Sequence, residues 1–368
     1  MKFLDLKTQQ DRIRKPLEKR FNAILDHGAY IMGPEVYELE EKLADYCGVK
    51  HAISCSSGTD ALLIPLMAWG IGPGDAVFTT PFTYVATAEV IALLGATPVF
   101  VDVYDSTFNI NCEKLEIAIQ DTIKDGKLIP KAIIPVDLFG VPARYRLIQE
   151  IANTYHLKVI EDAAQSFGGS IGEKKAGVFG DIAATSFYPA KPLGCYGDGG
   201  AMFTNDDSLA EQCRAIRIHG TSSDKYNSEI IGLNGRLDSM QAAVLLEKLT
   251  IFDEELEMRN KVNDYYRKSL NNAQHIPENY HSAHALFSIT LQSNQDREDL
   301  INRLNNNNIP NVVYYKHPIH LMKGFDYLGY KNGDFSVSEN LSQTIVSLPM
   351  HPYLSEIEID STIEVLKK

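Results

Sequence analysis

The sequence has no run of apolar residues that approaches the ~20 needed to cross a membrane as a helix. Its first residues, MKFLDLK, carry charges where a secretory signal needs an apolar core. Cysteine is scarce, and no metal-ligand spacing relates Cys47, Cys55, Cys112, Cys195 and Cys213. We therefore expect a cytoplasmic protein with reduced thiols and no bound metal.

Positive charge is also in deficit. Lysine and arginine total 35 against 48 aspartate and glutamate residues, which gives a formal net charge of −13. This balance argues against nucleic acid and an acidic membrane surface as partners, so an anionic ligand would need a local cationic pocket. The 368 residues, 44% hydrophobic and 23% charged, are typical of a globular protein long enough for two domains.

Short apolar segments alternate with helical patterns through the first part of the chain. Strands are expected at 51–54, 75–80, 97–103, 131–135 and 157–162, and helices at 85–94 and 145–155. The alternation is typical of an α/β fold in which helices cover both faces of a mainly parallel sheet. Ligands of such sheets bind beyond the carboxyl ends of the strands, where Gly58, Tyr84 and Asp162 fall.

The second part of the chain has a different pattern. Leucine periodicity predicts one long helix over 237–271. Strands at 285–291 and 312–315, with helices at 297–304 and after Ser355, then indicate a small α+β domain. We place a large domain at residues 1–245 and a small C-terminal domain at 246–368.

One stretch, TSFYPAKPLGCYGDGGAMFTN over residues 185–205, places a single lysine in a rigid setting. Lys191 stands between Pro189 and Pro192, and four glycines follow within the stretch. Prolines fix the backbone direction, and glycines permit turns where side chains would clash. An exposed loop lysine is the alternative interpretation, but the carboxylates that precede this stretch argue against it.

The apolar strand before this stretch ends in two carboxylates, Glu161 and Asp162. A lysine close to a carboxylate at a strand's end is the pair that pyridoxal 5′-phosphate requires. The lysine forms a Schiff base with the aldehyde, and the aspartate keeps the pyridine nitrogen protonated so that the ring accepts electrons. The pair therefore predicts an enzyme of this cofactor, with Lys191 and Asp162 as catalytic residues.

The segment CSSGTDAL, in which a helix begins, offers a site for the cofactor phosphate. Small residues at a helix N-terminus present backbone N–H groups and a favourable dipole to an anion, which makes Gly58 and Thr59 the candidates. A plain helix cap supplied by Ser57 or Thr59 is the alternative. Of the two nearby aromatic residues, Phe82 and Tyr84, either is suited to stack on a planar cofactor.

These stretches, taken in order, resemble the DegT/DnrJ/EryC1/StrS family of nucleotide-sugar aminotransferases over nearly the whole chain. The matching segments are HGAYIMGPEV, CSSGTDAL, FTYVATAEV, VIEDAAQSFG, SFYPAKPLGCYGDGGAMFTND, GLNGRLDSMQAA and SLPMHPYL. The resemblance implies the aspartate-aminotransferase-like fold, fold type I of the pyridoxal phosphate enzymes. It also implies a homodimer in which each subunit completes the other's active site.

The resemblance assigns roles around the cofactor. Lys191 is similar to the Schiff-base lysine and Asp162 to the partner of the pyridine nitrogen. Gln165 corresponds to the contact of the ring hydroxyl, and Tyr84, in preference to Phe82, takes the stacking position.

The same resemblance places Gly58, Thr59 and Ser186 in the phosphate cup of one subunit. Asn234 corresponds to a phosphate ligand that reaches over from the partner subunit, and Arg236 would then lie close to the substrate. The residues alone favour a turn and a helix-capping salt bridge for Asn234 and Arg236.

Two segments, CYGDGGAMFTND and SLPMHPYL, are similar to the subgroup that aminates C3 of UDP-2-acetamido-2-deoxy-3-oxo-glucuronate. The resemblance implies L-glutamate as amino donor and a role in making surface polysaccharide (O-antigen) sugars. Because this substrate carries a diphosphate and a carboxylate, a bidentate arginine contact is expected. Arg236 is the candidate, with His317 or His320 as a further polar contact.

Three alternatives stay open. One is amination at C3 or C4 of a dTDP- or UDP-linked 6-deoxy keto-sugar. A second is a sugar dehydratase of the same fold, although those enzymes have histidine where this chain has Lys191. The third is a non-catalytic regulatory protein, against which the intact Lys191 and Asp162 argue.

Overall fold

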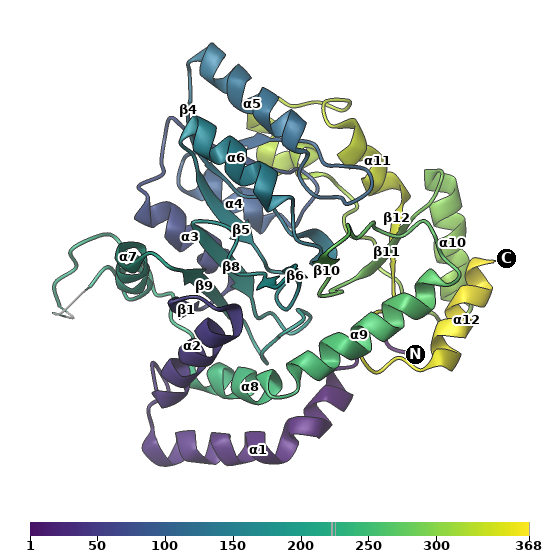
Figure 1. The fold of residues 1–368 in the computed structure, drawn as a ribbon, viewed down its shortest axis with the longest axis horizontal. Helices are drawn as coiled ribbons and strands as arrows, with labels where there is room; N and C mark the ends of the chain where they lie inside the picture. Colours follow the sequence, from purple (N-terminus) through teal and green to yellow (C-terminus); the bar gives the residue numbers. More distant parts are fainter. Residues whose placement is uncertain (222–223, 225, 368) are drawn as a thin grey trace.

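The protein, seen in Figure 1 as a computed structural model, is described for residues 1–221, 224 and 226–367. A seven-stranded sheet forms its centre, in the order β1-β9-β8-β5-β4-β2-β3. These strands are β1 (His51–Cys55), β2 (Asp75–Thr79), β3 (Thr97–Phe100), β4 (Ile129–Ile133), β5 (Lys158–Asp162), β8 (Ile182–Ser186) and β9 (Gly200–Thr204). The neighbours from β3 to β8 run parallel, whereas β9 is antiparallel to both of its neighbours. The predicted α/β class with a mainly parallel sheet is confirmed.

Helices cover both faces of this sheet (Figure 1). They are α1 (Leu6–His27), α2 (Pro34–Cys47), α3 (Gly58–Ala68), α4 (Ala86–Leu93), α5 (Cys112–Asp125), α6 (Tyr145–Tyr155), α7 (Asp207–Arg217) and α8 (Ser239–Leu249). Successive residues of a strand point to opposite faces. Val77 of β2 therefore packs in a cluster with α3, α4 and α7, and the adjacent Phe78 packs in a cluster with α5 and α6. This two-sided burial explains why the strands are apolar almost throughout.

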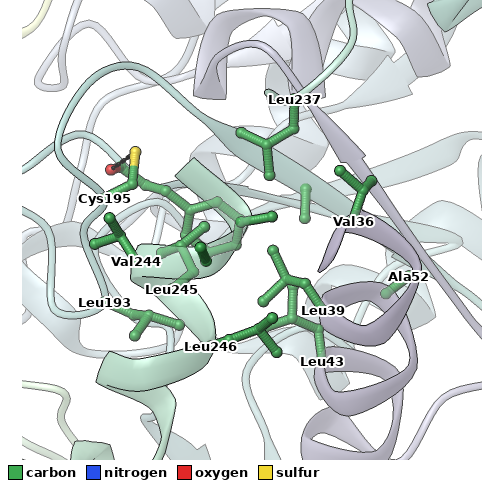
Figure 2. Packing of buried hydrophobic residues seen from close by; sticks show 14 of the residues in the cluster. Val36, Leu39, Leu43, Ala52, Leu193, Cys195, Leu237, Val244, Leu245 and Leu246 are labelled. Atoms are coloured by element: carbon green, nitrogen blue, oxygen red, sulfur yellow. Dashed lines mark hydrogen bonds between the residues drawn. The ribbon is translucent and has the colours of Figure 1, made fainter. Parts of the chain in front are cut away.

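A further buried cluster joins α1, α2 and α8 to the sheet, and Figure 2 shows part of it. Leu39 and Leu43 of α2 lie beside Leu246 of α8 in this cluster, while Val244 points to the other side of α8, toward Cys195. Leu193 and Cys195 of the 185–205 stretch belong to the same cluster. The segment that carries Lys191 is thus fixed from behind by the hydrophobic core.

The C-terminal part has its own cluster of buried residues, drawn from Val262 onward. Its elements are α9 (Phe252–Arg267), β11 (Phe287–Thr290), α10 (Asn294–Asn306), α11 (Ser336–Thr344), β12 (Ile345–Leu348) and α12 (Glu356–Leu366), with short helices η2 (Ile319–Leu321) and η3 (Lys323–Leu328). Strands β11 and β12 pair antiparallel, while the strand predicted at 312–315 is reduced to one bridge between Val312 and Ser347. Elsewhere, β6 (Ser170–Ile171), β7 (Lys174–Lys175) and β10 (Tyr280–His281) form a small sheet, and η1 spans Leu138–Gly140.

The single helix predicted over 237–271 is wrong, because α8 and α9 are separate helices. Between them, the Thr250 hydroxyl donates a hydrogen bond of 2.7 Å to the Glu247 carbonyl. Ile251 then leaves the helical region, with φ of −114° and ψ of 2°. Threonine side chains compete in this way with backbone helix bonds, a local effect that leucine periodicity does not report. The division after residue 245 falls inside α8 and stays a prediction.

No helix among the described residues is both long and apolar enough to cross a membrane.

A buried carboxylate connects the first part of the chain to α11. The Asp102 side chain accepts hydrogen bonds from the Ser338 backbone (2.9 Å), the Ser338 hydroxyl (2.7 Å) and the Val337 backbone (3.1 Å). Lys114 pairs with the same carboxylate at 2.9 Å. Burial alone would raise the pKa of Asp102, but the hydrogen bonds from Ser338 and Lys114 outweigh it and hold that pKa below its usual value.

We predict that Asp102→Ala lowers the free energy of unfolding by about 3 kcal/mol, because it leaves buried N–H groups without an acceptor. A carboxylate whose folded pKa is lowered stabilises the fold above its unfolded pKa of about 3.9, and this contribution is lost as the pH falls. In urea unfolding experiments the deficit should therefore stay constant from about pH 7 to about pH 5 and shrink as the pH falls below about 4. Asp121→Ala, at an exposed position of α5, is the control; equal losses in both variants would contradict the prediction.

Candidate active site

A cleft of about 440 Å³ lies beyond the carboxyl ends of β5 and β8. Seven of the residues singled out in the sequence line it together: Gly58, Thr59, Tyr84, Asp162, Gln165, Ser186 and Lys191. They come from segments far apart in the chain, which the parallel sheet brings to one edge.

Asp162 is the last residue of β5 and is 4% exposed. One carboxylate oxygen accepts a hydrogen bond from the Thr87 hydroxyl at 2.9 Å, and the other accepts from the Ala164 backbone at 3.2 Å. Burial raises the pKa of Asp162 above its usual value, although these bonds and the charge of Lys191 oppose the shift. The side chain is therefore oriented from behind and open toward the cleft.

Lys191 lines the same cleft from the segment that follows β8. Its backbone N–H donates to the Tyr188 carbonyl at 2.8 Å, which closes the turn that presents the side chain. Burial lowers the pKa of Lys191, and the nearby Asp162 charge partly opposes this shift. The two side chains do not form an ion pair within 4.0 Å, so both line the cleft and the cleft stays open between them.

The segment behind Lys191 is held by close backbone contacts. The Cys195 backbone donates to the Phe187 carbonyl at 2.7 Å, and the buried Lys248 ammonium donates to the Gly194 carbonyl at 2.6 Å. A side chain at Gly194 would come within 2.6 Å of the Tyr188 carbonyl oxygen, so only glycine fits. These contacts, with the core packing of Figure 2, give Lys191 a fixed base.

The N-terminus of α3 forms a cradle suited to an anion. Ser57 caps the helix by accepting a hydrogen bond of 3.0 Å from the Asp60 backbone, as the alternative interpretation of this segment predicted. The N–H groups of Gly58 and Thr59 still have no partner within the helix, since the first turn of any helix leaves them unpaired. A Cβ at Gly58 would stand 2.6 Å from the Ser186 Cβ, so the two segments touch only because residue 58 is glycine.

Gln165 and Tyr84 line the remaining walls. The Gln165 amide oxygen accepts from the Phe139 backbone at 2.8 Å, and its nitrogen donates to the Tyr315 hydroxyl at 3.0 Å. Tyr84 is 59% exposed and lines the cleft, whereas Phe82 is wholly buried in the core and does not. Of the two aromatic candidates, only Tyr84 is placed where a planar ligand can meet it.

Sequence reasoning did not find Thr87, Leu286, Tyr314 and Tyr315, which also line the cleft. Thr87 lies one helical turn after Tyr84, a spacing from which it could have been found. The other three belong to the C-terminal part of the chain, and only the fold brings them to the cleft. No local pattern marks them.

The structure does not bring Asn234 and Arg236 into this cleft. Both side chains lie near the surface, where the Arg236 guanidinium donates two hydrogen bonds, of 3.0 and 2.8 Å, to the Asn234 amide oxygen. A role in the cleft of a second subunit stays a prediction.

His320 is likewise outside the cleft, contrary to its proposed contact with substrate. Its side chain is buried, its ring packs edge-on against Phe335, and Nε2 lies 3.0 Å from the Glu339 carboxylate. Burial lowers its pKa. The KHPIH segment suggested a further polar contact with substrate, but His320 is buried beside the apolar cluster that includes Ile319 and Phe335.

Three features of the cleft match three parts of pyridoxal phosphate. The buried aspartate suits the pyridine nitrogen, the lysine suits the aldehyde, and the anion cradle at the start of α3 suits the phosphate. The glycine at position 58 lets the start of α3 meet Ser186 closely, and the cleft that Lys191 and Asp162 both line leaves room for a ring. The fold and this donor set define the class of pyridoxal-phosphate-dependent enzymes of fold type I.

Comparison with known proteins makes the assignment specific. The sequence model of the DegT/DnrJ/EryC1/StrS aminotransferase family matches residues 11–367, so the chain belongs to this family. It is a pyridoxal-phosphate-dependent sugar aminotransferase.

Three relatives illustrate the likeness. The chain is 45% identical to the UDP-2-acetamido-2-deoxy-3-oxo-D-glucuronate aminotransferase of Pseudomonas aeruginosa, over 98% of this chain and 97% of the relative. It is 40% identical to a pleiotropic regulatory protein of Geobacillus stearothermophilus, over 98% and 96%. A crystal structure of a DegT DnrJ EryC1 StrS aminotransferase from Brucella abortus superimposes with a TM-score of 0.96, at 50% identity, over 100% of this chain and 98% of the other.

We predict that Gly58→Ala weakens binding of pyridoxal phosphate about 10- to 100-fold, because the new methyl group collides with Ser186. Alanine has the better helix propensity, so the loss cannot come from weakening α3. Titration of the cofactor into apo-protein, followed by absorbance, measures the effect. Gly324→Ala is the control, since a Cβ there meets nothing within 4 Å. An unchanged cofactor affinity in Gly58→Ala would contradict a phosphate site at the start of α3.

Proposed function

We propose that this aminotransferase moves an amino group from L-glutamate to C3 of UDP-2-acetamido-2-deoxy-3-oxo-glucuronate, in the cytoplasm, for surface polysaccharide (O-antigen) sugars. The observation that carries the chemistry is the placement of Lys191 and Asp162 across one cleft without a direct ion pair. The likeness to the Pseudomonas aeruginosa enzyme, at 45% identity over nearly the full length, supports the substrate.

In this proposal Asp162 holds the protonated pyridine nitrogen, and Thr87 and Ala164 keep its two oxygens oriented. Gly58, Thr59 and Ser186 hold the phosphate, Gln165 meets the ring hydroxyl and Tyr84 stacks on the ring. When bound, the cofactor supplies an aldehyde for the amine and a ring that accepts electrons from the Cα–H bond.

Lys191 is then the group that moves the proton. As general base, its amine would take the proton from Cα of the amino acid. As general acid, it would then deliver that proton to C4′, the carbon of the cofactor aldehyde. Burial lowers the pKa of Lys191, which increases the neutral fraction that can accept a proton near neutral pH. The same lysine serves both half-reactions, because the second reverses the first with a keto-sugar in place of the keto acid.

Asn234 and Arg236 are assigned to the cleft of a partner subunit in a homodimer. They come from the segment just before α8, away from the cleft of their own chain. Arg236 offers the planar pair of donors that suits a diphosphate or a carboxylate.

Lys191→Ala should abolish turnover, a loss of about 1000-fold or more, and remove the visible absorbance of the lysine-bound cofactor. Stopped-flow absorbance after mixing with L-glutamate measures both. Lys261→Ala, at an exposed position of α9, should change neither. Retention of both signals in Lys191→Ala would remove Lys191 from the proposed role.

The substrate is tested by product analysis. The protein is first mixed with L-glutamate, which should convert the cofactor to its amino form and release 2-oxoglutarate. The amino form is then offered the UDP-linked 3-oxo-glucuronate or a dTDP-linked 6-deoxy keto-sugar, and NMR identifies the product. We expect amination of the UDP-linked uronate at C3. Preference for the dTDP-sugar would favour the alternative substrate class, and no reaction with glutamate would count against glutamate as the amino donor.

A further inference from the structure

Three carboxylic acids lie side by side at the base of the cleft. Glu161 and Asp162 are consecutive on β5, and Asp137 follows β4, where its backbone N–H donates to the Asp162 carbonyl at 3.1 Å. Asp137 and Glu161 are completely buried, and only Asp162 lines the cleft. The chemistry proposed for the cleft uses Asp162 alone.

Asp137 is held by three donors. Its Oδ1 accepts from the Ala143 backbone and from the Tyr145 hydroxyl, both at 2.8 Å, and its Oδ2 accepts from the Ser166 hydroxyl at 2.7 Å. Ser166 directly follows Gln165, so this carboxyl fixes the short segment that carries a cleft residue.

Glu161 points to the opposite face of β5 from Asp162, as alternate strand residues do. Its two oxygens accept from the Gly177 backbone at 2.7 Å and the Phe179 backbone at 2.8 Å. Burial raises the pKa of Glu161, and the neighbouring Asp137 side chain raises it further through its charge and a hydrogen bond.

The other ionisable groups that face Asp137 and Glu161 bring no positive charge. They are Tyr145 of α6, Cys47 of α2 and Tyr280 of β10, together with Asp162, which itself faces Lys191 across the cleft. Within the described part of the chain, none of the three carboxyls forms an ion pair, and no group of acidic, histidine or cysteine side chains is arranged to hold a metal. A buried carboxylate without a cation or metal is costly, and two in contact cannot both be ionised.

We propose that Asp137 and Glu161 share one proton and act as a neutral positioning pair, which leaves Asp162 as the ionised carboxylate of the cleft. The proposal rests on the role assigned to Asp162 in the proposed function. The shared proton removes a negative charge from beside Asp162 and lets the pair keep its five hydrogen bonds to both flanking segments.

The direction of the pH effect follows from burial. Burial raises the pKa of Asp137 to about 7 and raises that of Glu161 well above its usual value. The folded protein therefore retains a proton that the unfolded chain releases near pH 4. Because the native state binds more protons, this pair lowers stability as the pH rises from about 4, until the native state also releases the proton.

Asp137→Asn replaces a protonated acid by a neutral group of the same shape. Its amide oxygen can accept from Ala143 and Tyr145, and its NH₂ can donate to Glu161 or to the Ser166 oxygen. We expect kcat to stay within about threefold of the unmodified enzyme, whereas Asp137→Ala should lose about tenfold or more by releasing the Gln165 segment. The cofactor-saturated protein is used for all variants.

The second measurement is the thermal midpoint of the same holoenzymes between about pH 5 and about pH 9. The unmodified protein should lose stability relative to Asp137→Asn as the pH rises, because the asparagine has no proton to release. Glu161→Gln provides a second neutral replacement if Asp137→Asn does not fold. The proposal of a shared proton would be overturned if the thermal midpoints of the unmodified protein and Asp137→Asn changed in parallel with pH. A loss of kcat in Asp137→Asn as large as in Asp137→Ala would overturn it too.

These outcomes are separable from failure of the proposed function. The pH dependence of the thermal midpoint is measured without turnover, so it tests the carboxyl pair even if the sugar substrate named in the proposed function is incorrect. Loss of the cofactor signal in unmodified protein would instead count against the role of Asp162, and with it against the positioning of Asp162 by this pair.

Discussion

The site depends on keeping a buried carboxylate and a buried amine in one cleft without letting them pair. Asp162 and Lys191 would gain by direct contact, since burial disfavours the charged form of each. The fold prevents that contact by fixing each from behind. Asp162 ends a central strand and is bonded by Thr87 and Ala164, while Lys191 stands on a segment anchored in the core and bonded to Lys248. The free energy of folding thus maintains a separation that a ring-shaped ligand can fill.

The sequence predicted the parts of this site that local backbone chemistry specifies. Gly58, Asp162 and Lys191 could be found because a helix start, a strand end and a proline-flanked turn each leave a pattern over a few residues. The parallel sheet followed from the alternation of apolar strands with helices, and its carboxyl edge told where those residues would meet. The fold class and the pair of Lys191 and Asp162 could therefore be predicted from the sequence.

The rest could not be predicted, because tertiary contacts decide it. Tyr315 reaches Gln165 from 150 positions away in the sequence, and no short pattern records such a contact. The burial of His320 was missed for the same reason: Phe335, which its ring contacts, lies 15 positions away, and the KHPIH segment that ends at His320 is rich in polar residues. The break between α8 and α9 coincides with a hydrogen bond of the Thr250 hydroxyl, a weaker signal in the sequence than the leucine repeat that spans it.

Charge gives an independent reason to expect a second subunit at the cleft. Among the residues that line it, Lys191 is the only cation, and Asp162 and Asp198 are anions. A sugar nucleotide carries at least two negative charges on its diphosphate, and the whole chain adds a net charge of −13. The protein's overall field therefore opposes binding, and in the proposed reaction Lys191 is committed to the reacting amine. The proposed homodimer would supply the missing cationic contact from the partner subunit. Arg236 lies near the surface and donates to the neutral Asn234 amide, and no carboxylate among the described residues forms an ion pair with its guanidinium.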